Sequence, residues 1–498
     1  MSSDVTPNNL AETGISGLDD ILGGGLTANR LYLIEGDPGT GKTTLGLKFL
    51  LAGVALGEPT VYVSLSETRD ELEVVAQSHG WSLGGVTVTE LAPTEEVLDA
   101  DAENTMFHPS ELELGETTRT ILHDVERVKP RRVVFDSLSE MRLLAANPLR
   151  YRRQILALKQ FFVGRRCTVM LLDDRTSDIS DLQLQSLAHG VISLERRSPE
   201  YGVMQRRLQI IKMRGKPFRP GYHDYSIVRG GLDVFPRLVA AEHHEPFAPE
   251  TIKSGLTALD DLLGGGLDRG TSTLLMGPAG SGKSTIATQF AVAAARRGER
   301  TALFLFDERR ATLLTRSAAL GLDLREHLAS GRMGIDEIDP GAISAGEFVH
   351  HVRCEVDQRQ ARVIVIDSLN GFLNSVPEAR FLAIQLHELL SFLGQRGVTT
   401  LLVVAQHGLI GSMETPVDAS YLADCVVLLR YFEAEGRVRQ SLSVLKKRSG
   451  IHERTIRELE LRADGILVGA PLSAFHGVLT GVPRYVGQSR IDEDDVAP

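Results

Sequence analysis

The sequence predicts an α/β protein made of two tandem copies of one domain, each a mostly parallel β-sheet flanked by helices. Three observations predict this fold class: the length, an internal duplication, and apolar strands that alternate with helical segments. The 498 residues exceed what one hydrophobic core ordinarily holds, so two or more domains are expected. The composition is 42% hydrophobic and 24% charged with 48 glycines, which fits a globular α/β protein.

The sequence contains an internal duplication. The stretch TGISGLDDILGGGL, which begins at Thr13, returns as SGLTALDDLLGGGL from Ser254. The following GDPGTGKTT, from Gly36, returns as GPAGSGKST from Gly277. The spacing is the same, because 254 − 13 and 277 − 36 both equal 241. Two copies at one spacing indicate a tandem pair of domains rather than a solenoid.

Each copy contains the same order of predicted elements. Strands are expected in LYLIEG, TVYVSLS, RRVVFDS and CTVMLLDD, and again in TSTLLMG, TALFLFD, RVIVIDS and VTTLLVVAQ. Helices are expected between them, as from the Lys42 region to about Gly57 and over Arg69–His79. Near-continuous Val, Ile and Leu separated by helices indicate a parallel sheet covered on both faces. The Pro- and Glu-rich AAEHHEPFAPETIK between the copies places the boundary near Pro246, giving domains 1–245 and 246–498.

Composition also excludes several classes of protein. The net charge of −11 argues against nucleic acid as the main partner, because phosphate binding needs a basic footprint. No apolar run approaches the ~20 residues that cross a bilayer, and the opening MSSDVTPNNLAET lacks the hydrophobic centre of a signal peptide. We therefore expect no membrane association and a cytoplasmic location. Cys167, Cys354 and Cys425 form no CxxC pair, so a zinc ribbon is excluded and buried free thiols are expected.

Two glycine-rich loops match the pattern GxxxxGK[ST]. Their glycines let main-chain N–H groups cradle phosphate oxygens at the positive end of the following helix. Lys42 and Lys283 are expected to reach the β- and γ-phosphates, and Thr43 and Ser284 to offer a hydroxyl to Mg²⁺. The loops therefore predict ATP and Mg²⁺ as cofactors. The expected ATP-binding residues are Gly36, Gly39, Thr40, Gly41, Lys42, Thr43 and Thr44, with Gly277, Gly280, Ser281, Gly282, Lys283, Ser284 and Thr285.

Acidic residues follow two strands of each copy. Asp136 and Asp367 end RRVVFDS and RVIVIDS, where the carboxyl end of a buried parallel strand meets the ligand crevice. They are expected to hold Mg²⁺ in the Walker B role, the alternative being helix caps. Glu67 and Glu308 are again 241 apart, and each could orient or deprotonate the attacking water. The alternative is a surface acid that begins a helix.

Basic residues lie at the end of a predicted strand near the C-terminal end of each copy. They lie far in sequence from the phosphate loop of the same copy, so they suit insertion into the ATP site of a neighbouring subunit as arginine fingers. The alternative is a solvated basic strand end. These residues are Lys212, Met213 and Arg214 in LQIIKMRG, with Lys446, Lys447 and Arg448 in LSVLKKRS.

With these motifs assembled, the chain resembles the KaiC family of RecA/DnaB-like P-loop ATPases over roughly residues 10–485. The most specific features are the doubled GGGL-plus-P-loop block, SHGW at residues 78–81, KMRG at 212–215, LKKRSGIHERTIRE, and FHGVLTGVPR from Phe475. The resemblance implies ATP-dependent double-ring hexamers with nucleotide between adjacent subunits, and it adds Ser78 to the ATP-binding residues. It further implies an ATPase first ring, a second ring with autokinase and autophosphatase activity, and a signalling or circadian timing role. It leaves regulatory protein partners open.

The sequence departs from the family after the second strand of each domain. The family's two consecutive glutamates are Ser66-Glu67 in the first copy and Asp307-Glu308 in the second. Serine cannot act as a carboxylate base, so the first domain depends on Glu67. Asp307, assigned to catalysis and to Mg²⁺, is one methylene shorter than glutamate, and a shift of about 1 Å can cost roughly 10²-fold in rate. We therefore expect slow turnover in both rings.

A second departure concerns the phosphoacceptors. The family's adjacent Ser-Thr aligns with Ser420-Tyr421, and Thr415 matches a nearby family threonine. Ser420 is the phosphoacceptor candidate, with a plain loop hydroxyl as the alternative, and Tyr421 argues against a cycle that uses both positions. The chain ends in the acidic RIDEDDVAP, whose relation to any partner stays open.

Two other function classes compete with an ATP-hydrolysing ring with autokinase activity. One is a DNA-acting recombinase or helicase on the same fold, which the acidic charge and the missing zinc ribbon disfavour. The other is an ATP-gated scaffold that scarcely hydrolyses ATP, for which Ser66 is the clue.

Overall fold

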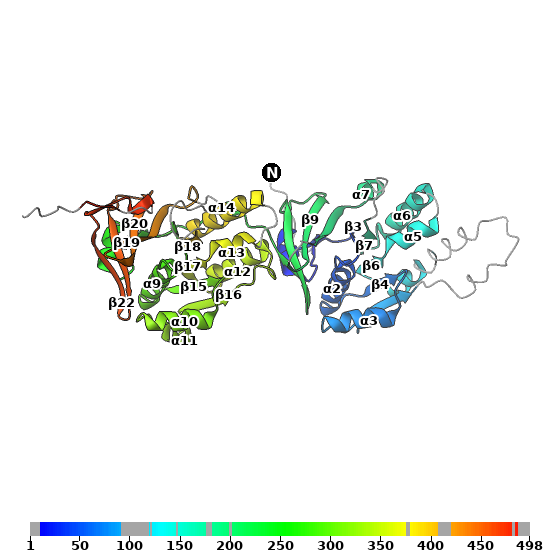
Figure 1. The fold of residues 1–498 in the computed structure, drawn as a ribbon. Helices are drawn as coiled ribbons and strands as arrows, with labels where there is room; N and C mark the ends of the chain where they lie inside the picture. The colour runs from blue at the N-terminus through cyan, green and yellow to red at the C-terminus, as the bar shows by residue number, and fades with distance from the viewer. Residues whose placement is uncertain are drawn as a thin grey trace, which may run out of the picture. The chain divides into compact units, whose positions relative to one another are not determined.

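The computed structural model describes residues 10–90, 119, 122–145, 148–175, 182–198, 202–374, 379–406, 420–480 and 484–486. The chain divides into two compact units, Met1–Arg237 and Leu238–Pro498, called domain 1 and domain 2 below. Leu238 and Ala240 are buried in the core of domain 2, so the segment expected as a linker packs partly on that domain. Each domain contains one nine-stranded sheet, and the ribbon is drawn in Figure 1.

The sheet of domain 1 has the strand order β11-β10-β9-β8-β3-β7-β6-β4-β5. The six strands from β8 to β5 are parallel, and β9, β10 and β11 continue the sheet in antiparallel fashion. The strands are β3 (Leu31–Gly36), β4 (Thr60–Ser64), β5 (Val86–Glu90), β6 (Arg132–Asp136), β7 (Thr168–Asp174), β8 (Gly190–Arg197), β9 (Gln205–Met213), β10 (Tyr222–Val228) and β11 (Gly231–Phe235). The small strands β1 (Leu10–Ala11) and β2 (Leu26–Thr27) pair separately.

Domain 2 repeats this connectivity in the order β16-β15-β17-β18-β14-β19-β20-β21-β22. Its strands are β14 (Ser272–Gly277), β15 (Arg300–Leu305), β16 (Met333–Glu337), β17 (Ala361–Asp367), β18 (Thr399–Ala405), β19 (Cys425–Ala434), β20 (Arg437–Lys447), β21 (Ile456–Arg462) and β22 (Gly465–Pro471). Two short pairs join β12 (Thr251–Ile252) to β13 (Leu267–Asp268) and β23 (Phe475–His476) to β24 (Arg484–Tyr485).

Helices cover both faces of each sheet because the buried strands are apolar on both sides. In domain 1, α2 and α3 lie on one face and α5 and α6 on the other (Figure 1). In domain 2, α9, α10 and α11 lie opposite α12, α13 and α14. The helices are α1 (Ser16–Ile21), α2 (Lys42–Ala55), α3 (Arg69–Ser78), α5 (Leu138–Ala145), α6 (Pro148–Phe162), α7 (Leu182–Leu187), α8 (Thr257–Leu262), α9 (Lys283–Arg296), α10 (Arg310–Ala319), α11 (Arg325–Ala329), α12 (Ala345–Asp357), α13 (Leu369–Asn374) and α14 (Ala379–Gln395).

The predicted fold class is confirmed in both domains. Parallel strands place the carboxyl ends of β3, β4 and β6 at one end of the sheet, and those of β14, β15 and β17 likewise. The candidate residues that follow these strands are therefore brought together, as expected for open α/β sheets, whose ligands bind beyond the carboxyl ends of the strands. A search of the helices in the described ranges finds none with the length and apolar character needed to cross a membrane.

Candidate functional site

The phosphate loop of domain 1 joins the end of β3 at Gly36 to the start of α2 at Lys42. Gly39 and Gly41 have φ values of 79° and 91°, a left-handed backbone that side-chain-bearing residues rarely adopt. Lys42 is buried, and its Nζ donates to the main-chain oxygen of Gly36 at 2.8 Å. The same Nζ lies 2.7 Å from Asp174 Oδ1. The lysine is thus held over the loop, where a phosphate oxygen would replace the carboxylate as its partner.

A cavity of about 420 Å³ opens in front of this loop. Its lining combines loop glycines with acidic and hydroxyl side chains. The lining residues are Pro38, Gly39, Gly41, Lys42, Thr43, Thr44, Ser66, Glu67, Val75, Asp136, Ser137, Glu140, Asp174 and Ile227. The loop amides and Lys42 suit a polyphosphate, and the oxygen atoms opposite them suit a hard cation such as Mg²⁺.

The side of this cavity that could hold a cation is built around Asp136 at the end of β6. Thr43 Oγ donates to Asp136 Oδ2 at 2.7 Å, and the buried Tyr62 hydroxyl donates to the same oxygen at 2.5 Å. Burial raises the pKa of Asp136, while the hydrogen bonds from Tyr62 and Thr43 lower it. The hydroxyl–carboxylate pair fits a cation that keeps phosphate and water as its other ligands. In the described part of the chain, no three or more His, Cys, Asp and Glu side chains gather into a denser metal cluster.

Glu67 lies on the turn between β4 and α3. Ser64 fixes this turn, because its hydroxyl accepts the N–H of Glu67 at 2.9 Å and donates to the Glu67 carbonyl. Thr68 then caps α3 through a capping box with Glu71. Burial raises the pKa of the Glu67 carboxyl, and the nearby Asp136 charge adds to the rise. A half-buried carboxylate of raised pKa in this cavity is suited to accept a proton from water.

The phosphate loop of domain 2 repeats this geometry. Gly280 and Gly282 have φ values of 76° and 100°, and Lys283 Nζ donates to the Pro278 carbonyl at 2.7 Å. Burial lowers the pKa of Lys283 to about 8. Burial raises the pKa of Asp367, which accepts a hydrogen bond from Ser284. Ser284 and Asp367 therefore match Thr43 and Asp136.

The acids that follow β15 have hydrogen-bond partners that have no counterpart among the described residues of domain 1. Asp307 accepts a hydrogen bond from the Ser368 hydroxyl. Both carboxylate oxygens of Glu308 accept from Arg316, at 3.1 Å from Nε and 2.9 Å from Nη2. The equivalent Glu67 has a buried Oε2 without a hydrogen-bond partner. The two candidate bases therefore sit in different surroundings.

The basic strand ends lie at the opposite end of each sheet from the phosphate loop. Met213 pairs with Gly190 at the start of β8, and Gly190 is level with Tyr32 near the start of β3. The phosphate loop follows the end of β3, so about five residues at ~3.3 Å each separate the two sites. Lys447 pairs with Cys425 at the start of β19 in the same way. Lys212–Arg214 and Lys446–Arg448 thus cannot reach the loop of their own domain.

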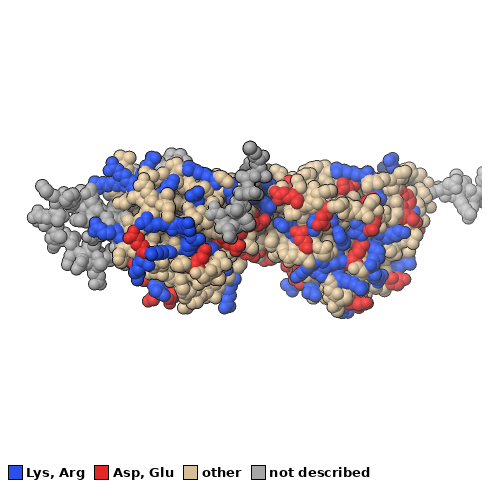
Figure 2. Space-filling model, turned by 180° about the vertical axis from the view of Figure 1, so that it is seen from behind, with Lys and Arg blue, Asp and Glu red and all other residues tan. Residues whose placement is uncertain are grey.

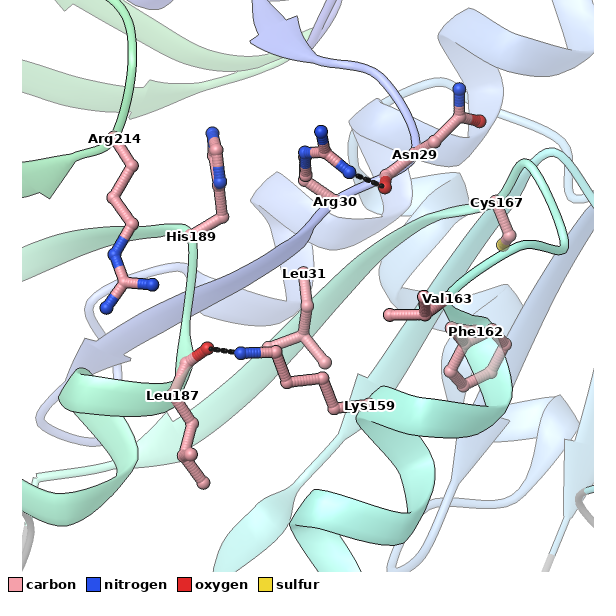
Figure 3. A pocket seen from close by; sticks show the side chains of 10 residues that line it. All are labelled: Asn29, Arg30, Leu31, Lys159, Phe162, Val163, Cys167, Leu187, His189 and Arg214. Atoms are coloured by element: carbon pink, nitrogen blue, oxygen red, sulfur yellow. Dashed lines mark hydrogen bonds between the residues drawn. The ribbon is translucent and has the colours of Figure 1, made fainter.

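A second cavity of about 270 Å³ adjoins Arg214 in domain 1. Figure 3 shows Arg30, Lys159, His189 and Arg214 around its rim, with apolar side chains such as Leu31 and Phe162 between them. Lys159 Nζ donates to the Leu187 carbonyl at 2.7 Å, and Arg214 Nη2 to the Ser186 carbonyl at 2.9 Å. The lining holds three cationic side chains and no carboxylate, so the rim of this cavity is basic.

Domain 2 differs at the corresponding position. The main-chain N–H of Arg214 bonds to the carbonyl of His189, and that of Arg448 bonds to the carbonyl of Asp424. Asp424 also lies 3.4 Å from the Arg448 guanidinium. Burial, followed by the charge of Arg30, lowers the pKa of His189. The arginine of domain 2 is therefore partly neutralised, whereas Arg214 has no carboxylate partner among the residues that the structure describes.

The remaining predicted residues lie elsewhere. The Ser78 hydroxyl donates to the Val75 carbonyl at 2.7 Å, and Ser78 does not line the domain 1 cavity. Its neighbour His79 comes closer, with Nε2 3.4 Å from Thr44 Oγ1. The Ser420 carbonyl accepts Lys446 Nζ at 2.8 Å, which places Ser420 at the basic end of domain 2. Thr415 and the tail 490–498 lie outside the described residues.

Sequence reasoning missed several residues of these sites, among them Tyr62, His79 and Arg316. Tyr62 reads as one more apolar residue of a strand, and Arg316 as a solvated charge on a helix. A signal existed only for His79, which belongs to the SHGW segment. The other two act through contacts with residues distant in the sequence.

Comparison with known proteins places the chain in a family. The family model described as "ATPase: KaiC" matches residues 11–239 and again residues 252–473. "Circadian clock protein KaiC3" of Synechocystis sp. is 26% identical over 97% of this chain and 96% of its own length. "Circadian clock oscillator protein KaiC" is 25% identical in Parathermosynechococcus lividus, over 97% of this chain and 89% of the relative, and 25% identical in Synechococcus elongatus, over 97% and 94%. The doubled match over both domains shows that the chain belongs to the KaiC family of ATPases.

Proposed function

We propose that the chain binds and hydrolyses Mg²⁺-ATP at two sites, one in each domain. Loop amides with Lys42 and Lys283 would hold the phosphates. Thr43 with Asp136, and Ser284 with Asp367, would hold the magnesium ion. The observation that carries this proposal is the 2.7 Å contact between Thr43 and Asp136 beside the phosphate loop that ends at Lys42. In domain 2 the same contact joins Ser284 to Asp367 beside Lys283.

Glu67 and Glu308 would orient and deprotonate the attacking water, with Asp307 as a further acid of domain 2. Turnover is expected to be slow, because Ser66 supplies no second carboxylate and Asp307 is shorter than glutamate. Since the relatives are named circadian clock proteins, we propose a timing or signalling role for this slow hydrolysis.

ADP release by the parent, Glu67→Gln, Glu308→Gln and the double variant tests the catalytic assignment. Each single variant should lose the turnover of its own domain, and the double variant should fall by roughly 10²- to 10⁴-fold, the usual contribution of a general base. Unchanged turnover in the double variant would contradict the assignment. It would instead support an ATP-gated scaffold or a different base.

We further propose a homohexameric ring with ATP at the subunit interfaces. The phosphate loops and the basic strand ends lie at opposite ends of each sheet, which is the arrangement a head-to-tail cyclic contact requires. In such a ring Arg214 and Arg448 of one subunit would approach the phosphates bound by the next.

Subunit mixing tests the ring directly. A Lys42→Ala/Lys283→Ala chain lacks phosphate-loop lysines, and an Arg214→Ala/Arg448→Ala chain lacks the basic ends. Each alone should be inactive, whereas a mixture assembled with ATP should recover activity at interfaces that pair an intact loop with an intact basic end. Mixtures that stay inactive, in particles that native mass spectrometry shows to be mixed hexamers, would contradict the proposal.

Autokinase activity in domain 2 completes the proposal, with Ser420 as phosphoacceptor. Ser420 adjoins Lys446 at the end of the sheet that would face a neighbour's nucleotide, so its hydroxyl would attack the γ-phosphorus and release ADP. Incubation with γ-labelled ATP and site mapping by mass spectrometry should find label on Ser420 that Ser420→Ala removes and Ser449→Ala retains. Label that survives in Ser420→Ala would show that Ser420 is only a loop hydroxyl.

The competing DNA-dependent ATPase is not favoured. On the face shown in Figure 2, the blue basic and red acidic side chains of the described residues are interspersed over both domains. With a net charge of −11, this surface does not provide the basic stripe that phosphate-backbone binding uses.

A further inference from the structure

One of the positions at which the two domains differ lies in the wall of the nucleotide cavity. In domain 1, Val75 on α3 lines the cavity beside the phosphate loop. The helix α10 of domain 2 carries Arg316 at this position, because 316 − 75 equals the 241-residue spacing of the duplication. An apolar side chain is thus replaced by a cation in domain 2 alone.

Arg316 uses all three guanidinium nitrogens on residues of the proposed active site. Nε and Nη2 donate to the two oxygens of Glu308, at 3.1 and 2.9 Å. Nη1 donates at 2.9 Å to Oγ1 of Thr285, in the first turn of the phosphate-loop helix. The pair is mostly shielded, since the Arg316 and Glu308 side chains are 28% and 22% exposed. The guanidinium group, called the fork below, therefore links the candidate base Glu308 to the helix that carries Lys283.

Domain 1 contains no such tie. No cationic side chain of the described residues pairs with Glu67, whose Oε2 is buried without a hydrogen-bond partner. Thr44, the counterpart of Thr285, faces His79 instead. Among the described residues, Glu67 therefore has no cationic partner, whereas both carboxylate oxygens of the equivalent Glu308 accept from Arg316.

We propose that Arg316 is a positioning residue that restrains Glu308 and thereby slows ATP hydrolysis in domain 2. This inference rests on the proposed role of Glu308 as base. To accept a proton from water, the carboxylate must give up part of a bidentate, charge-assisted pair, and its protonation would leave the guanidinium without its counter-charge. The restraint therefore opposes base catalysis without contributing to phosphate binding.

The test is made in a Glu67→Gln background, so that turnover reports domain 2. Arg316→Met keeps much of the side-chain length and removes the fork. It should raise kcat roughly three- to tenfold, equivalent to about 0.7–1.4 kcal/mol of activation free energy, with KM unchanged. Arg316→Lys keeps the charge without the fork and should fall between. Arg309→Met, at the start of the same helix, controls for loss of charge and should leave kcat as it was.

Adding Glu308→Gln separates this inference from the proposed function. If Arg316 acts through Glu308, Arg316→Met should change nothing once Glu308 is glutamine. A Glu67→Gln/Glu308→Gln chain that still turns over would overturn the base assignment itself. A fall in kcat, a rise in KM, or an increase that persists without Glu308 would overturn only the restraint. Circular dichroism of each variant checks folding, and Arg316→Lys provides the same comparison if Arg316→Met does not fold.

Discussion

Tyr62 allows a specific perturbation of the proposed magnesium site of domain 1. Its hydroxyl is fully buried and donates at 2.5 Å to Asp136 Oδ2, the oxygen that also accepts Thr43. Tyr62→Phe removes one hydrogen bond to a charged acceptor and little else. Such bonds contribute about 1.5–3 kcal/mol, so the free energy of unfolding should fall by that amount. For a domain of this size the melting temperature should drop by about 3–12 °C.

The fluorescence of Trp81 measures this loss, because Trp81 is the chain's only tryptophan and packs against the core of domain 1. Tyr32→Phe is the matched control. Tyr32 is equally buried, but its hydroxyl donates at 2.8 Å to the neutral carbonyl of Thr27, so only about 0.5–1.5 kcal/mol should be lost. Equal losses in the two variants would refute the special strength assigned to the Tyr62–Asp136 contact.

Tyr62→Phe should also change the pH dependence of domain 1. The hydrogen bond from Tyr62 lowers the pKa of Asp136 against the effect of burial, so its removal raises that pKa further. Magnesium needs the ionised carboxylate. In a Glu308→Gln background, the acid limb of the ATPase profile should therefore move to higher pH, and an unmoved limb would contradict this role for Tyr62.

Two further predictions concern other buried cations. Arg132 is 2% exposed and donates to Glu58 at 2.5 Å and to the carbonyls of Glu12 and Phe49. Arg132→Met should lower the free energy of unfolding of domain 1, measured by Trp81 fluorescence, by about 3–5 kcal/mol. Arg165 pairs with Glu126 at the surface, so Arg165→Met should cost less than about 1 kcal/mol, and similar losses in the two variants would contradict the importance of the buried contacts. Burial lowers the pKa of Lys283 to about 8, so its charge is present below that pH and lost above it. The affinity of domain 2 for Mg²⁺-ATP, measured in a Lys42→Ala chain, should therefore weaken from pH 7 to pH 9. Lys283→Arg does not titrate in this range and should bind with less pH dependence, and identical pH profiles for the two chains would contradict this prediction.

Much of the fold could be predicted because the domain sequence is duplicated. The 241-residue spacing and the apolar strands predict two parallel sheets with phosphate loops at their carboxyl ends, and the shared strand order confirms the fold class. The antiparallel strands β9–β11 and β20–β22 were not predicted in this detail. They are half-exposed outer strands, as in QRRLQIIKM, and their pairing depends on long-range register rather than on a continuous apolar pattern.

The site was predictable where function depends on local backbone and not where it depends on tertiary contact. The glycine loops and the acids after each strand can be read from spacing alone. Tyr62 lies 74 residues from Asp136, and only the register of β4 against β6 brings them together. The contacts of Arg316 with Glu308 and Thr285 likewise form only when α10 packs beside the phosphate-loop helix.

Calorimetric titration with Mg²⁺-ATP tests the central claim most directly. The parent should bind two nucleotides per chain, Lys42→Ala and Lys283→Ala one each, and the double variant none. A parent that shows no binding, or a double variant that binds as tightly as the parent, would contradict the claim that each domain grips a magnesium–triphosphate through its loop amides and lysine.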